Sequence, residues 1–186
     1  PLLDSSAASD VYRGQNLFLI GHGSGAQLAL ALAALSANPV WQQDFAIDLA
    51  GLSFRALVLN HPVVFFEDLS GKTVRERGEL RFLRQRLFGS DRALKKAFYD
   101  PSAYSAAVRY SYPPVRILSS AGDYRYGSQA VTLANLLANN SVRLETDFSS
   151  DGTLGHNYNS ADIDSLASLT ANNGIAGFLL RNSRQH

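Results

Sequence analysis

The sequence predicts an α/β domain in which a mostly parallel sheet is flanked by helices. Short apolar runs alternate with helical patterns along the chain, and a glycine or proline turn closes each run, which is typical of parallel strands joined by helices. The chain has 186 residues, of which 46% are hydrophobic and 18% are charged. That length and composition suit one globular core, and we expect a single domain over residues 1–186.

The first strand and helix are predicted within residues 17–33, LFLIGHGSGAQLALALA, where an apolar run, a glycine-rich turn and an alanine- and leucine-rich stretch follow one another. The second strand falls in residues 54–63 and ends at a proline, which disfavours helix just before it. The third, residues 115–119, follows two prolines, and the fourth, residues 141–148, alternates apolar with polar side chains. Leucine and isoleucine spacing predicts the remaining helices, over residues 128–139 and 160–181.

Residues 66–111 break this alternation, and we expect a helical insertion there that acts as a lid. Two amphipathic helices are predicted on either side of Gly89-Ser90-Asp91, with Asp91 as an N-cap.

Residues 71–98 hold nine of the 17 basic residues and three acidic ones, a net charge of +6 in a chain whose net charge is +1. Such a patch attracts anionic substrates or surfaces, while a solvated helix face is the alternative interpretation. Contact between this patch and a membrane surface is a further alternative. No nucleic-acid-binding motif accompanies the patch, so we expect no nucleic-acid partner.

Other classes of protein are disfavoured by what the sequence lacks. The absence of cysteine excludes disulfides, thiolate metal sites and a cysteine nucleophile. The histidines lack the spacing of a metal motif, so we expect neither a metal nor another cofactor. No apolar run approaches the roughly 18 residues of a membrane span. The sequence does not identify the cellular compartment, and we expect a cytoplasmic location.

The glycine-rich turn is compatible with two chemistries. Residues 21–26, GHGSGA, complete the pattern G-x-G-x-x-A and nearly complete G-x-S-x-G, with Gly23 where the second pattern has serine. A dinucleotide site would need a second strand that ends in an acid, and FAID could supply one that ends at Asp48. An NAD(P)-binding oxidoreductase domain is therefore one alternative.

A nucleophile on this turn would need an acid and then a histidine later in the chain. Asp123 follows the third predicted strand and His156 follows the fourth. A serine hydroxyl attacks only when a base takes its proton, and a carboxylate fixes the tautomer of that base. Asp147 and Asp151 are rival acids. The carboxyl ends of parallel strands meet at one edge, so the hydrolase interpretation is favoured.

Two long stretches carry a resemblance to a known family. LFLIGHGSGAQLALALA resembles the strand, turn and helix of the α/β-hydrolase superfamily, and DPSAYSAAVRYSYPPVRILSSAGDYRYGSQAVTLANLL resembles its acid loop and the next helix. The similarity is to the esterase branch that includes kynurenine formamidases and isoprenylcysteine methylesterases, from the fifth strand of the fold onward. It implies hydrolysis of a carboxylic ester or ester-like amide, a small molecule, through an acyl-serine intermediate. It also implies that Gly23 is the nucleophile position, Asp123 the acid, His156 the base and the Ser24 N–H an oxyanion donor.

The sequence departs from that family in two places. Gly23 has no hydroxyl, so the nucleophile is either missing or shifted to Ser24; the bulky His22 favours position 23, because the turn needs small residues two places on either side of the nucleophile. The histidine-glycine-glycine loop of the family's first half is also absent. We therefore expect the C-terminal portion of a hydrolase, impaired as it stands, whose first half belongs to the same precursor or to another chain. A catalytically silent binding protein is the remaining alternative. His22 is expected to point away from the site, and His61 to be structural.

Overall fold

The computed structural model describes residues 16–44, 46–49, 51–65, 74–88 and 112–183. Within them lies one parallel sheet in the order β1-β2-β3-β4. The strands are β1 (Phe18–His22), β2 (Ala56–Asn60), β3 (Val115–Ser120) and β4 (Leu144–Ser149). The helices are α2 (Gly25–Ala37), α3 (Pro39–Asp44), α4 (Val74–Phe88), α7 (Gly127–Asn139), α8 (Tyr158–Ala161) and α9 (Leu166–Asn182). The predicted class, a mostly parallel sheet with flanking helices, is confirmed.

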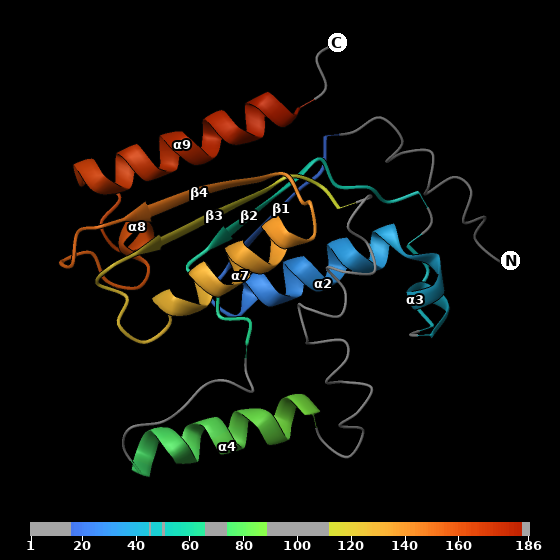
Figure 1. The fold of residues 1–186 in the computed structure, drawn as a ribbon, viewed down its shortest axis with the longest axis horizontal. Helices are drawn as coiled ribbons and strands as arrows, with labels where there is room; N and C mark the ends of the chain where they lie inside the picture. The colour runs from blue at the N-terminus through green and yellow to red at the C-terminus, as the bar shows by residue number, and fades with distance from the viewer. Residues whose placement is uncertain (1–15, 45, 50, 66–73, 89–111, 184–186) are drawn as a thin grey trace, which may run out of the picture.

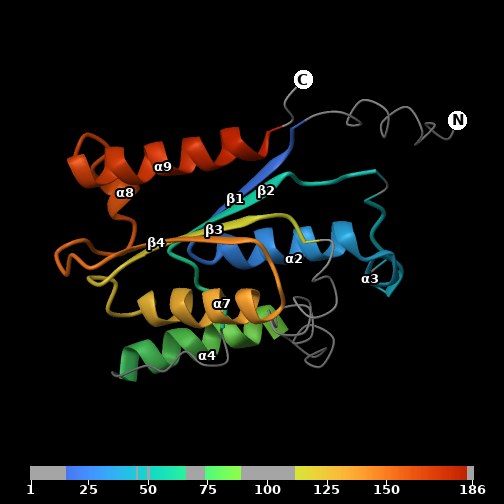
Figure 2. The same ribbon diagram turned by 45° about the horizontal axis from the view of Figure 1, so that its top comes forward.

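The sheet is the middle of three layers. Figure 1 shows α2 and α7 on one face and α9 on the other, and Figure 2 shows the same arrangement after rotation. Because side chains alternate along a strand, β2 sends Leu57 and Leu59 toward one cluster of buried residues and Val58 toward another. Both faces of the inner strands are therefore covered, which is why β2 reads as a nearly continuous apolar run.

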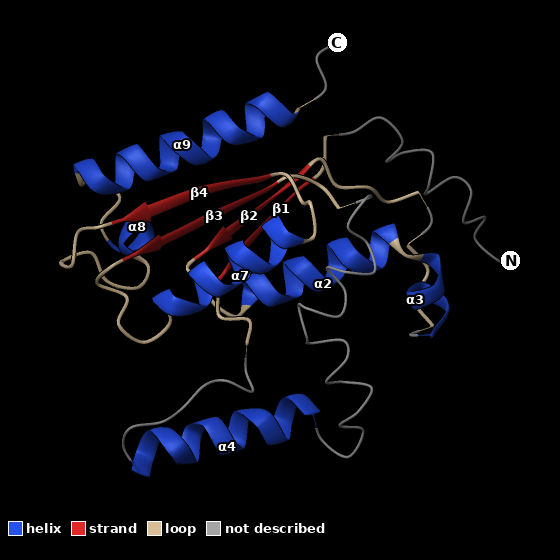
Figure 3. Ribbon diagram, viewed as in Figure 1, coloured by secondary structure: helices blue, strands red, loops and turns tan. Residues whose placement is uncertain are grey.

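The order of elements in the chain brings four turns to one edge of the sheet. All four strands run parallel, and Figure 3 shows their arrowheads pointing the same way. The segment after each strand carries one candidate residue: Gly23 after β1, His61 after β2, Asp123 after β3 and His156 after β4. This edge is where ligands bind in open α/β sheets.

Several boundaries differ from the prediction. The last predicted helix, residues 160–181, is divided into α8 and α9, because the Ser165 hydroxyl accepts a hydrogen bond from the Ser168 N–H and caps a new helix. Residues 46–49 form no strand and Asp48 is exposed, so the strand that the dinucleotide interpretation needs is missing from this described stretch.

Of the predicted insertion, the structure describes one helix. α4 ends at Phe88, where the sequence places a break, and the predicted second helix lies outside the described residues. α4 lies farther from the sheet than α2 and α7 do (Figures 1 and 2). Four arginines on α4 are exposed, so this part of the basic patch faces solvent: Arg75, Arg77, Arg81 and Arg86. The role of the insertion as a lid remains a prediction. None of the helices in the described ranges has the length and apolarity to cross a membrane.

Candidate active site

The turn between β1 and α2 is held in a conformation that favours glycine at its apex. Gly23 has a φ of +54°, in the left-handed region that side chains rarely adopt. Its N–H donates to the Asn60 carbonyl at 3.0 Å, and its own carbonyl accepts from the Val63 N–H at 2.9 Å. A methyl group on Gly21 would lie 2.5 Å from the Ala26 Cα. Position 23 is therefore the apex of a tight strand-to-helix turn, clamped from the end of β2.

The residues next to the apex separate the two nucleophile registers. Ser24 is the N-cap of α2, with φ −68° and ψ −21°, so it already has helical dihedrals and not those of the apex. A Cβ on Gly25 would meet nothing within 4 Å. The expectation of tight packing on both sides of the apex thus holds at Gly21 and is wrong at Gly25.

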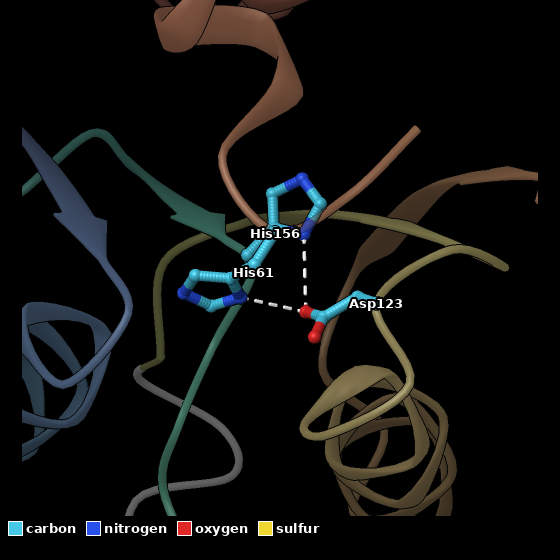
Figure 4. A group of neighbouring side chains, drawn as sticks. All are labelled: His61, Asp123 and His156. Atoms are coloured by element: carbon cyan, nitrogen blue, oxygen red, sulfur yellow. Dashed lines mark hydrogen bonds and ion pairs between the residues drawn. The ribbon is translucent and has the colours of Figure 1, made fainter. Parts of the chain in front are cut away.

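Asp123 and His156 are hydrogen-bonded to each other at the same edge. The distance from His156 Nδ1 to Asp123 Oδ2 is 2.7 Å, and Figure 4 shows the imidazole standing over the carboxylate. The Asp123 side chain is 2% exposed and the His156 side chain 28%. On the other side of the ring, His156 Nε2 lies 3.7 Å from a Cβ built on Gly23. The imidazole therefore lies between the acid and the apex of the turn.

The Asp123 carboxylate is held in its charged form. Burial raises its pKa, but hydrogen bonds from His156 and His61, the electrostatic attraction of His156 and the Tyr126 N–H outweigh burial and hold the pKa well below its usual range. The Tyr126 N–H donates to the second oxygen, Oδ1, at 3.2 Å. An ionised carboxylate can only accept hydrogen bonds, so both imidazoles present a proton to it.

The rival acids are engaged elsewhere. Asp147 pairs with Arg116 at 2.8 Å, and Asp151 accepts hydrogen bonds from the backbone N–H and hydroxyl of Thr153. Within the described ranges, Asp123 is the carboxylate that contacts His156.

Two histidines belong to this site although the sequence did not place them there. His61, with a φ of +46°, is buried and lies with Nδ1 3.3 Å from Asp123 Oδ2. The His22 ring centroid lies 5.5 Å from that of His156, so the expectation that it points away is wrong. The sequence did contain a signal for His61: it follows the strand next to that of Asp123, and neighbouring parallel strands end together.

A chain of three side-chain amides, two of them buried, links the histidine loop to the sheet. The Asn60 side chain donates to Asn159 Oδ1 at 2.9 Å, and Asn159 donates to Asn172 Oδ1 at 3.1 Å. Asn159 follows His156 by three residues and lies in α8, while Asn172 lies in α9. The end of β2 thus contacts both the apex of the turn and the element that follows His156.

The same side chains are the candidate metal ligands in the described part of the chain. Ligand atoms of His61, Asp123 and His156 all lie within 4.8 Å of one another. A metal-bound histidine ordinarily donates its other ring N–H to an acceptor, and His61 Nε2 has no such partner. The two hydrogen bonds to Asp123 account for the cluster without a cation, and the donor set does not favour one.

The histidine cluster predicts a mild acid sensitivity. Burial lowers the pKa of His22; the Asn157 side chain opposes this shift, and the neighbouring His156 and His61 imidazoles add to it. The folded protein then binds fewer protons at His22 than the unfolded chain, so the free energy of unfolding should fall as the pH drops below about 6.5.

We expect His22→Gln to flatten this dependence between about pH 5 and 6.5 in urea unfolding experiments. The contribution of Asp123 is lost only below about pH 4, near the unfolded pKa of aspartate, and so does not enter this window. An unchanged slope in the variant would contradict the prediction.

Comparison with known proteins gives structural neighbours. No family model and no curated protein matches the sequence. Esterase B from Lactobacillus rhamnosis has a TM-score of 0.81 at 20% identity, over 91% of this chain and 54% of that chain. Carboxyl esterase 2 from Tuber melanosporum has a TM-score of 0.65 at 17% identity, over 91% of this chain and 55% of that chain. A thermostable esterase from Pseudomonas putida has a TM-score of 0.62 at 15% identity, over 91% and 52%.

These likenesses bear on the fold. The chain spans about half the length of the solved esterases that it matches. They do not single out kynurenine formamidases or isoprenylcysteine methylesterases. The parallel sheet, its flanking helices and these neighbours together show that the chain has the α/β-hydrolase fold found in esterases.

Proposed function

We propose that this chain is the C-terminal portion of a serine-type carboxylic ester hydrolase in which Gly23 stands at the nucleophile position. One observation carries the proposal: His156 is hydrogen-bonded to a buried carboxylate through Nδ1 and faces the apex of the turn with Nε2, 3.7 Å from where a Cβ would be. Nucleophile position, acid and base in that order along the chain are the α/β-hydrolase arrangement.

The chemistry follows from the roles that these positions can take. A hydroxyl introduced at position 23 would give its proton to His156 Nε2 and attack the ester carbonyl. His156 would return that proton to the leaving alcohol as the ester C–O bond breaks, and water would then hydrolyse the acyl-serine. Asp123 would hold His156 in the tautomer that leaves Nε2 free to accept a proton, and would stabilise the imidazolium once formed. Ser24 is the N-cap of α2, where the first amides lack intrahelical partners. Its N–H would donate to the oxyanion.

With glycine at position 23 the chain lacks the attacking oxygen, so we expect impaired hydrolysis. A catalytically silent binding protein on this fold is the second candidate, and Gly23 itself is the observation that favours it.

The proposal also concerns the strands that would lie beside β1. Among the strands that the structure describes, β1 lies at the edge of the sheet, and Ile20 on it is 61% exposed. An open strand edge with apolar side chains is a site where further strands pair. We therefore propose that a preceding segment or a second polypeptide adds the remaining strands beside β1 and supplies the second oxyanion donor. The kynurenine formamidase and isoprenylcysteine methylesterase likeness, a lid role for the insertion and a cytoplasmic location remain finer proposals.

The test is covalent labelling of Gly23→Ser with a fluorophosphonate, in the protein together with the polypeptide that completes its sheet. The new hydroxyl should be phosphonylated to near stoichiometry, because His156 is placed to take its proton. The parent chain should label weakly or not at all.

Mass spectrometry locates the adduct. Strong labelling of Ser24 in the parent chain would contradict the assignment of position 23. A folded Gly23→Ser protein that neither labels nor hydrolyses an activated ester would favour the silent binding protein.

A further inference from the structure

His61 occupies a place where the fold brings three strand ends together. It follows the last residue of β2, and its backbone N–H donates to the Leu118 carbonyl of β3 at 2.9 Å. Its side chain is 0% exposed. The rings of Tyr158 and His156 pack against it edge-on, with centroid distances of 5.4 and 5.3 Å. The position of the imidazole is thus fixed by packing on two sides and by the backbone.

The hydrogen bond of His61 determines where its proton is. Asp123 Oδ2 is an acceptor, so His61 Nδ1 at 3.3 Å must carry the hydrogen. Nε2 of His61 is buried and has no hydrogen-bond partner, and a proton there would be a buried donor without an acceptor. His61 therefore presents a single donor, and that donor is directed at the carboxylate.

Oδ2 is shared unequally between the two histidines. His156 lies at 2.7 Å and His61 at 3.3 Å from the same oxygen, and the dashed lines in Figure 4 converge on it. Two donors that share one oxygen draw on the same lone-pair density, so each hydrogen bond weakens the other. The shorter bond to His156 shows which of them dominates.

The end of β2 is also the clamp for position 23. The Asn60 carbonyl accepts the Gly23 N–H at 3.0 Å, and the Val63 N–H donates to the Gly23 carbonyl at 2.9 Å. His61 lies between these two contacts in the chain. Because the His61 side chain is hydrogen-bonded to Asp123, it fixes the acid relative to the apex of the turn.

We propose that His61 is a positioning residue: its Nδ1–H holds Asp123 Oδ2 in register with Gly23 and moderates the strength of the Asp123–His156 hydrogen bond. The catalytic consequence rests on the proposed ester hydrolysis, whereas the positioning itself does not. The groups that face His61 and His156 are Asp123, His22, Tyr126 and Tyr158.

The test reads the imidazole protons directly by proton NMR on the folded protein. The parent should show two low-field N–H resonances, from His61 and His156, and both should disappear in Asp123→Asn. His61→Leu removes the donor; the remaining His156 resonance should then move downfield, because Asp123 Oδ2 serves one donor only. His61→Asn places an amide donor near the position of Nδ1 and tolerates a positive φ, so the His156 resonance should stay near its parental position.

Tyr158→Leu is the matched control, because it removes packing against His61 without removing the donor. A His156 resonance that does not move in His61→Leu, or that moves as far in Tyr158→Leu, overturns the proposal. If His61→Leu does not fold, loss of the His156 resonance in a folded His61→Asn protein overturns it instead.

Kinetics in the Gly23→Ser background separate this proposal from the proposed function. His61→Leu should lower kcat by at least tenfold and leave KM within about twofold, and His61→Asn should recover most of kcat. If Gly23→Ser shows no hydrolysis while the resonances behave as expected, the proposed function fails and the positioning role of His61 stands.

Discussion

Asp123→Asn in the Gly23→Ser background should lower kcat for an activated ester by up to about 10⁴-fold, the scale seen when a triad acid is neutralised without loss of geometry. The structure gives a specific reason. The carboxylate accepts hydrogen bonds at both oxygens, from the Tyr126 N–H at Oδ1 and from two imidazoles at Oδ2. An amide must turn its NH₂ toward one of these sets of donors. In either orientation one donor faces another, and the negative charge that stabilises the imidazolium is lost. With the NH₂ toward the imidazoles, His156 is also no longer held in the tautomer that leaves Nε2 free.

The measurement is kcat and KM in parent, Asp123→Asn and Asp151→Asn proteins, all carrying Gly23→Ser, with circular dichroism to establish that each is folded. Asp151 is the matched control, because it is exposed and its partner is Thr153. Its variant should keep kcat within a few fold. If Asp151→Asn lost as much activity as Asp123→Asn, the assignment of the acid would be wrong.

Gly21→Ala should destabilise the protein by more than about 3 kcal/mol, beyond the upper end of the usual cost of overpacking a core. A Cβ at Gly21 would lie 2.5 Å from the Ala26 Cα and 2.5 Å from the Gly25 carbonyl oxygen. Both are backbone atoms, so no side-chain rotation relieves the overlap. Relief would require β1 and α2 to move apart, at the expense of the core contacts that Ala26 and Ala29 make.

Urea unfolding of Gly21→Ala and Gly25→Ala measures this difference. Gly25 is the matched control: its Cβ would meet nothing within 4 Å, and it is the first residue of α2. Alanine favours helix over glycine, so Gly25→Ala should be neutral or stabilising by up to about 1 kcal/mol. Equal destabilisation of the two variants would contradict the steric account of the turn.

The sequence by itself was enough for the fold class and for the outline of the site. The prediction of a parallel sheet followed from local patterns, since apolar runs and helical spacing are properties of neighbouring residues. The positions of Asp123 and His156 after successive strands also followed, because parallel strands deliver their carboxyl ends to one edge. The Asp123–His156 hydrogen bond at 2.7 Å agrees with that pairing; their catalytic roles remain a proposal.

Only the tertiary structure decided which side chains share that edge and which glycine the turn requires. His61 and Asp123 are 62 residues apart, and His156 and Asp123 are 33 apart, so no local periodicity reports that two imidazoles meet one carboxylate oxygen. The structural engagement of Asp147 with Arg116, and the approach of His22 to His156, are likewise long-range contacts. Gly21 and Gly25 read alike in the sequence, but one packs against the backbone of α2 and the other faces open space. Such differences arise from the packing of β1 against α2 and of the strand ends against one another, and packing is a property of the folded chain rather than of any single segment of it.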